Sequence, residues 1–176
     1  MDLLADLSVT MLPHIGAFSP QQLSSTCVSF AVLGYSNSEL LNAIAKKVLL
    51  QLQSFSPKQL ARTVYGLGLA GCTDTRALDS CCTALQQRMH ALQPAALTQA
   101  LVGLSEAEYL SHPAVPQLLR AVGRKVEWLF AEDCVQLLLL LSKLAAAARL
   151  PQQQQQLQQL DRRGSQQLQL QLQQQP

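Results

Sequence analysis

The chain is poor in the residues on which β architectures depend. Only 5% of its 176 residues are aromatic, and glycine and proline number 8 each, too few for the many turns of a β-sandwich or barrel. Charged residues make up 14% and the formal net charge is +2, so the chain has neither a histone-like basic excess nor an acidic tail. These shortages favour an all-α protein. Any binding of a charged partner would depend on where a few charged residues lie, and not on the net charge.

Several kinds of site are also missing from the sequence. The five cysteines form no C-x-x-C pair, and their odd number at irregular spacing indicates neither a disulfide framework nor structural zinc. The three histidines have no cysteine or carboxylate at metal-ligand spacing on a shared helix face. No nucleophile elbow, phosphate loop, dinucleotide fingerprint or zinc-protease motif occurs. We therefore expect no metal, no cofactor and no enzymatic activity, in a reducing compartment.

Long apolar runs and targeting signals are absent as well. The most apolar stretch, 134–142, is nine residues long, about half of what crosses a bilayer. The first residues include Asp2 and Asp6, and no arginine precedes Arg62, which fits neither a secretory signal nor an arginine-rich transit peptide. We expect no membrane segment and no import signal in this sequence.

What the chain does contain is a repeat. Leucine, alanine and glutamine number 36, 21 and 25, which is 82 of 176 positions together. The segment FSPQQLSSTCVSFAVLG at Phe18 returns as FSPKQLARTVYGLGLAG at Phe55, an offset of 37. The same offset leads to LQPAALTQALVGL at Leu92 and LFAEDCVQLLLLL at Leu129, so units start at 18, 55, 92 and 129.

Each unit contains two amphipathic helices. In its first half, apolar residues recur four and then three positions apart, which is the spacing of one helix face. These positions are Leu23, Cys27 and Phe30, then Leu60, Val64 and Leu67, then Leu97, Leu101 and Leu104, then Cys134, Leu138 and Leu141. The second half repeats the pattern in columns such as Leu41, Leu78 and Val115, or Ile44, Cys81 and Leu118. The prediction is an all-α fold, a right-handed α-solenoid of helical hairpins.

Helix boundaries agree with this interpretation. Ser19-Pro20 and Ser56-Pro57, with Gln22 and Gln59 three residues after each serine, match a capping box with proline at the first helical position. Glycines at 34 and 71 stand where a helix ends on a left-handed residue. First helices are thus predicted over about 20–33 and 57–70, and second helices from about 38, 75 and 112. In the third unit Glu108 replaces the stopping glycine, and Gln93 replaces the capping serine.

The two ends of the chain differ from the repeats. Subtracting 37 from the second-helix columns gives Leu4, Leu7, Met11 and Ile15, so residues 2–15 are predicted to be a half-unit, and the chain a fragment of a longer array. Residues 1–150 would form the solenoid domain. Residues 151–176 hold 14 of the 25 glutamines and are predicted to be a low-complexity, disordered tail.

The repeat resembles a known family. FSPQQL with Thr26 and Gly34, and FSPKQL with Thr63 and Gly71, resemble the F-x-P-Q-x-L-x-N-T-L-W-A-L-A-x-L-G unit of octotricopeptide-repeat proteins and of the related FAST-kinase-like leucine-rich and RAP-domain proteins. The resemblance covers residues 2 to about 148 and places Val28 and Tyr65 at the frequent tryptophan. It implies a non-catalytic RNA-binding protein of a mitochondrion (matrix or ribonucleoprotein granule) or a chloroplast, acting on RNA processing, mRNA stability or translation.

Two surfaces are candidates for single-stranded RNA. In helical repeats the first helices usually line the concave side, where two or three side chains per repeat read a base. On the concave side, amide and hydroxyl groups would hydrogen-bond to base edges, and two cations would contact phosphate groups. This first-helix set is Gln22, Ser25, Ser29, Lys58, Gln59, Arg62 and Gln99.

The alternative surface is a row of basic residues along the second helices. This basic ridge comprises Lys46, Lys47, Arg88, Arg120, Arg124 and Lys125. A different class of function is also open, because an α-solenoid with little net charge can act as a protein-interaction scaffold. Its partners would be proteins of a ribonucleoprotein complex or further copies of the chain itself.

Overall fold

A computed structural model describes residues 3–149, and all of its regular elements over that range are helical. The α-helices are α1 (Leu3–Met11), α2 (Pro20–Val32), α3 (Ser38–Gln51), α4 (Pro57–Leu69), α5 (Thr75–Arg88), α6 (Pro94–Glu106) and α7 (Val115–Gly123), followed by a helix over 131–149. The chain divides into two compact units after Leu137, within that last helix. The predicted tail, 151–176, lies outside the described residues.

Helix starts follow the predicted interval. The first helices α2, α4 and α6 begin at Pro20, Pro57 and Pro94, and the last helix begins at 131, so each start is 37 residues after the one before. Short 3-10 turns at 52–54, 89–91 and 126–128 keep the same spacing. The second helices α3 and α5 are also 37 residues apart, whereas α7 begins at Val115, three residues later than predicted. The all-α class and the regular repeat of helix starts are confirmed.

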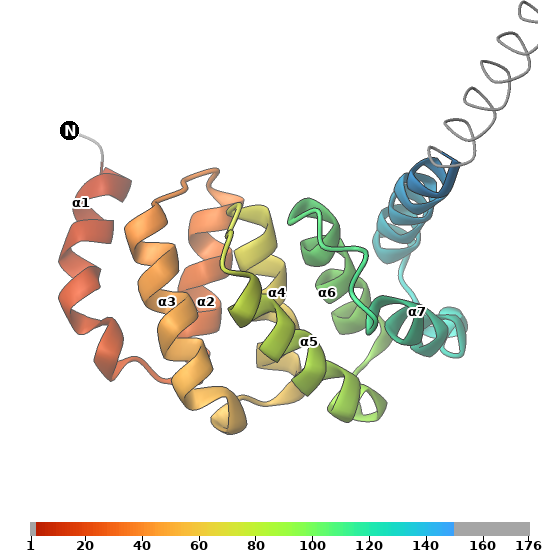
Figure 1. Ribbon diagram of the computed structural model, residues 1–176, viewed down its shortest axis with the longest axis horizontal. Helices are drawn as coiled ribbons and strands as arrows, with labels where there is room; N and C mark the ends of the chain where they lie inside the picture. The colour runs from red at the N-terminus through yellow and green to blue at the C-terminus, as the bar shows by residue number, and fades with distance from the viewer. Residues whose placement is uncertain (1–2, 150–176) are drawn as a thin grey trace, which may run out of the picture. The chain divides into compact units, whose positions relative to one another are not determined.

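The first helices form one layer of the Met1–Leu137 unit. Helix α4 packs against α2 on one side and α6 on the other, while α3, α5 and α7 each pack against the first helix of their own hairpin. Figure 1 shows α3 and α5 in front of α2 and α4. The predicted apolar columns meet between these layers. Their side chains are buried in the first three units: Leu23, Cys27, Phe30, Leu60, Val64, Leu67, Leu97, Leu101 and Leu104.

Three glycines let the first helices approach closely. A Cβ atom on Gly66 would lie 2.8 Å from the backbone carbon of Cys27, and one on Gly103 would lie 2.5 Å from the carbonyl oxygen of Val64. A Cβ on Gly68 would overlap the backbone of Gly103. The apolar columns place Gly66 on the exposed side of its helix, and this prediction is wrong, because the residue is buried where α4 meets α2.

Caps and stops form as the sequence predicts in the first two units. The backbone N–H of Ser19 donates to Gln22 Oε1 over 2.9 Å, and that of Ser56 donates to Gln59 Oε1 over 2.8 Å, completing two capping boxes. Gly34 and Gly71 have φ values of 68° and 73°. In the third unit, Gln93 provides no side-chain cap for α6.

Glu108 adopts the same left-handed conformation as Gly34 and Gly71, with φ 55°, although it carries a side chain. We expect Glu108→Gly to raise the free energy of unfolding by about 1 kcal/mol, because glycine adopts positive φ without the steric cost that Cβ imposes. Glu39→Gly is the matched control, since the same change in the first turn of α3 should lower stability. Thermal denaturation followed by circular dichroism measures both. A lower melting temperature for Glu108→Gly would contradict the prediction.

The fourth unit departs from the predicted burial. Leu138 is 65% exposed and Leu141 is 45% exposed, although both occupy columns that are buried in the earlier units. Cys134, in the first of these columns, is half-buried, and the buried leucine of this helix is Leu140. The prediction of a buried face through Leu138 and Leu141 is therefore wrong for the described residues.

Candidate nucleic-acid interface

The exposed side of α4 carries two cations and an aromatic ring. With Leu60, Val64 and Leu67 buried, the opposite side presents Lys58, Arg62 and Tyr65, four and then three residues apart. Lys58 is exposed, and the other two side chains are half-buried. We call these three residues the α4 strip.

Neighbouring first helices have corresponding positions. The residues that correspond to the α4 strip are Gln21, Ser25 and Val28 on α2, and Ala95, Gln99 and Val102 on α6. Gln21 and Gln99 are exposed, and the other four are half-buried. Because α2, α4 and α6 pack directly on one another, the three sets lie on adjacent helices of one layer.

The α4 strip is electrostatically positive. Neither α2 nor α4 contains an aspartate or glutamate. Within residues 3–149, Lys58 and Arg62 make no hydrogen bond or ion pair, so their charge is not neutralised by a neighbour. A pair of solvent-accessible cations that no carboxylate on α2 or α4 offsets can attract a phosphate over about a Debye length.

Two glutamines of the first-helix set have structural hydrogen bonds. The amide oxygens of Gln22 and Gln59 are acceptors in the two capping boxes. Gln59 Nε2 also donates to Gln21 Oε1 over 3.1 Å, which links α4 to α2 at the edge of the strip. These amides stabilise the helix layer, and their hydrogen-bonding capacity for a base edge is correspondingly small.

The remaining polar members of the set lie on two different helices, α2 and α6. Gln99 is exposed on α6, at the position equivalent to Arg62. Ser25 and Ser29 line a groove between α1 and α2, together with Leu7 and Met11. The structure therefore places Lys58 and Arg62 together with Tyr65, and separates them from Ser29.

Two residues of the basic ridge bond to the backbone at the residue where their own repeat unit begins. Arg88 Nη1 donates to the carbonyl oxygen of Phe55 over 2.9 Å, and Arg88 Nη2 donates to Gln53 Oε1 over 2.6 Å. Lys125, 37 residues later, donates through Nζ to the carbonyl oxygen of Leu92 over 2.8 Å. Phe55 and Leu92 are themselves 37 apart, so this is one contact formed twice. The sequence showed that 88 and 125 share a column, but only the fold reveals the acceptors.

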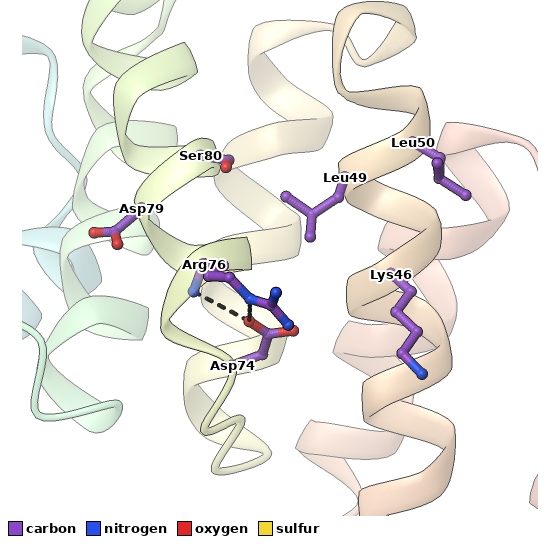
Figure 2. A pocket seen from close by; sticks show the side chains of 7 residues that line it. All are labelled: Lys46, Leu49, Leu50, Asp74, Arg76, Asp79 and Ser80. Atoms are coloured by element: carbon purple, nitrogen blue, oxygen red, sulfur yellow. Dashed lines mark hydrogen bonds and ion pairs between the residues drawn. The ribbon is translucent and has the colours of Figure 1, made fainter.

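The other four members of the ridge are not continuous. Lys46 and Lys47 belong to α3, whereas Arg120 lies on α7 and Arg124 is the residue directly after the end of α7. Helix α5 lies beside α3, and the groove between them is lined by Asp74, Arg76 and Asp79 as well as Lys46. Figure 2 shows Leu49 pointing from α3 towards α5, with Asp74 and Arg76 at the start of α5. Two carboxylates thus interrupt the positive charge of the second helices.

A polar cluster that sequence reasoning missed anchors the loop before α7. The Tyr109 hydroxyl donates to Asp79 Oδ1, and His112 Nε2 lies 3.4 Å from the same oxygen. His112 Nδ1 accepts the backbone N–H of Ala114 over 3.1 Å. The hydrogen bond to Asp79, with burial, raises the pKa of Tyr109 to about 12. This cluster holds residues 109–114 in turns, which explains the later start of α7.

Four of the five cysteines, Cys27, Cys72, Cys81 and Cys82, are buried packing residues. The adjacent Cys81 and Cys82 are buried, as their repeat positions predict, and burial raises the pKa of each thiol to about 12. Such thiols are almost entirely protonated near neutral pH and react slowly. Within residues 3–149, no three histidine, cysteine or acidic side chains gather as metal ligands. No helix in this range has the length and apolarity needed to cross a bilayer.

No family model, no curated protein and no solved structure matches the chain. The repeat pattern and the surface chemistry of the first helices are therefore the observations from which a function is inferred.

Proposed function

We propose that the chain binds single-stranded RNA along the exposed side of α2, α4 and α6. The observation that carries this proposal is the α4 strip, where Lys58, Arg62 and Tyr65 share one helix face with no carboxylate on α2 or α4. Cations that contact phosphate and an aromatic ring that stacks on a base are the recurring elements of single-strand binding.

Each first helix would offer one reading position. In this arrangement Tyr65 stacks on a base, and Lys58 and Arg62 contact the flanking phosphates. Ser25 on α2 and Gln99 on α6, at the position of Arg62, contribute hydroxyl and amide groups for base edges. With few phosphates neutralised, the affinity is modest and falls steeply as salt is added.

A wider proposal, about the cellular role of the chain, rests on the resemblance of its repeat to the octotricopeptide unit. The chain acts as an octotricopeptide-type protein with a right-handed α-solenoid, and its RNA lies on the concave face formed by the first helices. Its targets are organellar transcripts, in a mitochondrion or chloroplast, whose processing, stability or translation it affects without catalysing a reaction. The 37-residue interval of helix starts and the capping boxes of α2 and α4 support this assignment.

Tyr65 gives the sharpest single-residue test of RNA binding. We expect Tyr65→Ala to weaken binding of a single-stranded oligonucleotide by about 1–3 kcal/mol, because the side chain that stacks on a base is lost. Tyr65→Phe should bind as the parent chain does, since a phenyl ring stacks equally well. Fluorescence anisotropy at fixed salt measures both, and circular dichroism controls for folding. Equal affinities for Tyr65→Ala and the parent chain would refute stacking at this position.

A protein-interaction scaffold is the second candidate. Trp128 and Phe130 are 70% and 76% exposed, and with Lys125 and residues 90–95 they line a pocket. Exposed aromatic side chains beside a cation are typical of protein-binding surfaces. The two candidates differ in a simple measurement, because a scaffold shows no salt-dependent binding of single-stranded RNA.

A further inference from the structure

The groove between α3 and α5 runs between two neighbouring second helices. It has a volume of about 720 Å³, and its lining residues all fall between 46 and 80, well inside the described range. Lys46, Leu49 and Leu50 of α3 form one wall, and Arg76 and Ser80 of α5 belong to the other. Both walls are helices whose full length is described.

Apolar side chains occupy the α3 wall at positions that the next repeat fills with polar ones. Leu50 is 82% exposed, and Leu49 is half-buried. Thirty-seven residues later, α5 has Gln86 and Gln87 at the same positions. A second helix of this repeat therefore forms with glutamine at both sites, and folding does not require the two leucines. Adjacent leucines that are open to solvent beside a groove mark an interaction surface.

The next pair of second helices shows what the α3–α5 groove lacks. Between α5 and α7, Gln86 Nε2 donates to Gln117 Oε1 over 2.9 Å, so a polar contact links these two helices. The equivalent pair between α3 and α5 is Leu49 and Ser80. Figure 2 shows Leu49 directed from α3 towards α5. Because a leucine side chain forms no hydrogen bond, the α3–α5 groove offers apolar surface where amides link the next two helices.

The charge that the groove offers to a partner is positive. Lys46 is exposed and, within residues 3–149, forms no hydrogen bond or ion pair. The Arg76 side chain is 85% exposed, and its ion pair with Asp74 has an N–O distance of 3.9 Å. An ion pair this long and this exposed to water neutralises little of the charge of Arg76.

The two carboxylates beside the groove are engaged within the chain. The Asp74 side chain is 15% exposed, and its Oδ1 atom accepts two backbone N–H groups at the start of α5. Asp79 accepts the Tyr109 hydroxyl, and Figure 2 shows its carboxylate turned away from α3. A partner that lies on the α3 wall is therefore attracted by Lys46 and Arg76.

We propose that the α3–α5 groove binds an amphipathic helix of a partner protein, with leucine-type side chains against Leu49 and Leu50 and a carboxylate against Lys46. Lys46 precedes the two leucines by three and four residues, so all three lie on one face of α3. A partner helix along this face presents its carboxylate at the same spacing, about one turn from its apolar residues. Apolar grooves on helical proteins bind amphipathic helices in this way.

This interaction is separate from RNA binding. The α4 strip belongs to the first-helix layer, whereas α3 and α5 belong to the second-helix layer. An RNA strand in the groove would contact the cations but leave both leucines in water, and so the groove favours a peptide. Loss of one activity should leave the other intact.

Peptide selection against the full chain in RNA-free buffer tests the proposal. The probe is a phage-displayed library of helical peptides with one randomised face. Enriched peptides should share a leucine, isoleucine or methionine with an aspartate or glutamate three or four residues away. Fluorescence anisotropy then measures the affinity of a synthetic copy of one enriched peptide. Leu49→Gln with Leu50→Gln, which installs the residues of α5, should weaken its binding by about tenfold or more.

Val32→Gln with Leu33→Gln is the matched control for the two leucines. These adjacent side chains at the end of α2 are 67% and 62% exposed and lie outside the groove, so this variant should bind the peptide like the parent chain. Circular dichroism spectra confirm that both variants are folded. A library that yields no binding peptide overturns the proposal. So does a peptide that binds the variant at 49 and 50 as tightly as the parent chain.

A charge exchange tests the contact with Lys46. Lys46→Glu should weaken the acidic peptide by about fivefold, and should bind more tightly a peptide in which lysine replaces the acidic residue. RNA binding by Lys46→Glu should be nearly unchanged, whereas Lys58→Glu should weaken RNA binding and leave peptide binding intact. The proposal is wrong if Lys46→Glu does not prefer the exchanged peptide, or if single-stranded RNA displaces the acidic peptide from the parent chain.

Discussion

Replacing Gly68 with alanine should lower the free energy of unfolding by about 3 kcal/mol or more, enough to unfold a marginally stable chain. In an exposed helix the same change gains about 1 kcal/mol, because alanine is the better helix former. Here the new Cβ would overlap the backbone of Gly103, which cannot move without separating α4 from α6. Rigid backbone, unlike the end of a flexible side chain, leaves no inexpensive way to relieve the overlap.

Gly123→Ala is the control for Gly68→Ala. Gly123 ends α7, and a Cβ there would meet no atom within 4 Å. We expect this variant to be as stable as the parent chain or up to about 1 kcal/mol more stable. Urea denaturation followed by circular dichroism measures both variants. If Gly68→Ala unfolds at the same urea concentration as Gly123→Ala, then α4 and α6 do not pack as closely as described.

Removing both cations of the α4 strip should weaken RNA binding by about tenfold or more at low salt. In the double variant Lys58→Ala with Arg62→Ala, two phosphate contacts are lost, so the slope of log affinity against log salt should become shallower by about 1.4. Neither side chain bonds to another described residue, and so folding stability should be nearly unchanged. Anisotropy titrations of a single-stranded oligonucleotide across a salt series give both quantities.

The matched control removes one lysine and one arginine from the second helices. Lys46 and Arg120 are exposed, share a repeat column and are 74 residues apart, so Lys46→Ala with Arg120→Ala lowers the net charge by the same amount. We expect this variant to retain most of the affinity. If it loses more affinity than the α4-strip variant, RNA follows the second helices and the assignment to the first helices is wrong.

The sequence predicted those features of the fold that depend on local chemistry. The interval of 37, the capping boxes at Ser19 and Ser56, and the left-handed stops at Gly34 and Gly71 all follow from residues close together in the chain. Apolar columns likewise identified the buried faces of the first three units. Each of these signals is complete within one helical hairpin.

Features that depend on contacts between residues far apart in the sequence were predicted less well. Gly66 was placed on an open face because nothing local distinguishes an exposed glycine from one that admits a neighbouring helix. Arg88 was counted as a surface charge because its acceptor at Phe55 is 33 residues away. Asp79 and His112 showed no shared pattern, since they meet through a loop and not along a helix. Leu138 belongs to a column that is buried at Cys27, Val64 and Leu101, yet it is exposed itself, and its own helix gives no local signal of the difference.

Within the candidate site, the sequence identified Lys58 and Arg62 but not their relation to Tyr65. The family pattern treats position 65 as a replaced tryptophan. In the structure its ring shares the exposed face of the two cations, on a layer with no acidic residue in α2 or α4. The first-helix set was chosen for polar and charged side chains, so it left out an aromatic ring on the same face.

The most direct test of RNA binding is a salt titration of the parent chain. Affinity for a single-stranded RNA is measured from low to physiological salt, with a double-stranded RNA of the same length as the control. Binding to single strands on the first helices predicts preference for the single strand and a straight line of negative slope in log affinity against log salt. No binding at low salt, or binding that does not change with salt, would contradict the proposal.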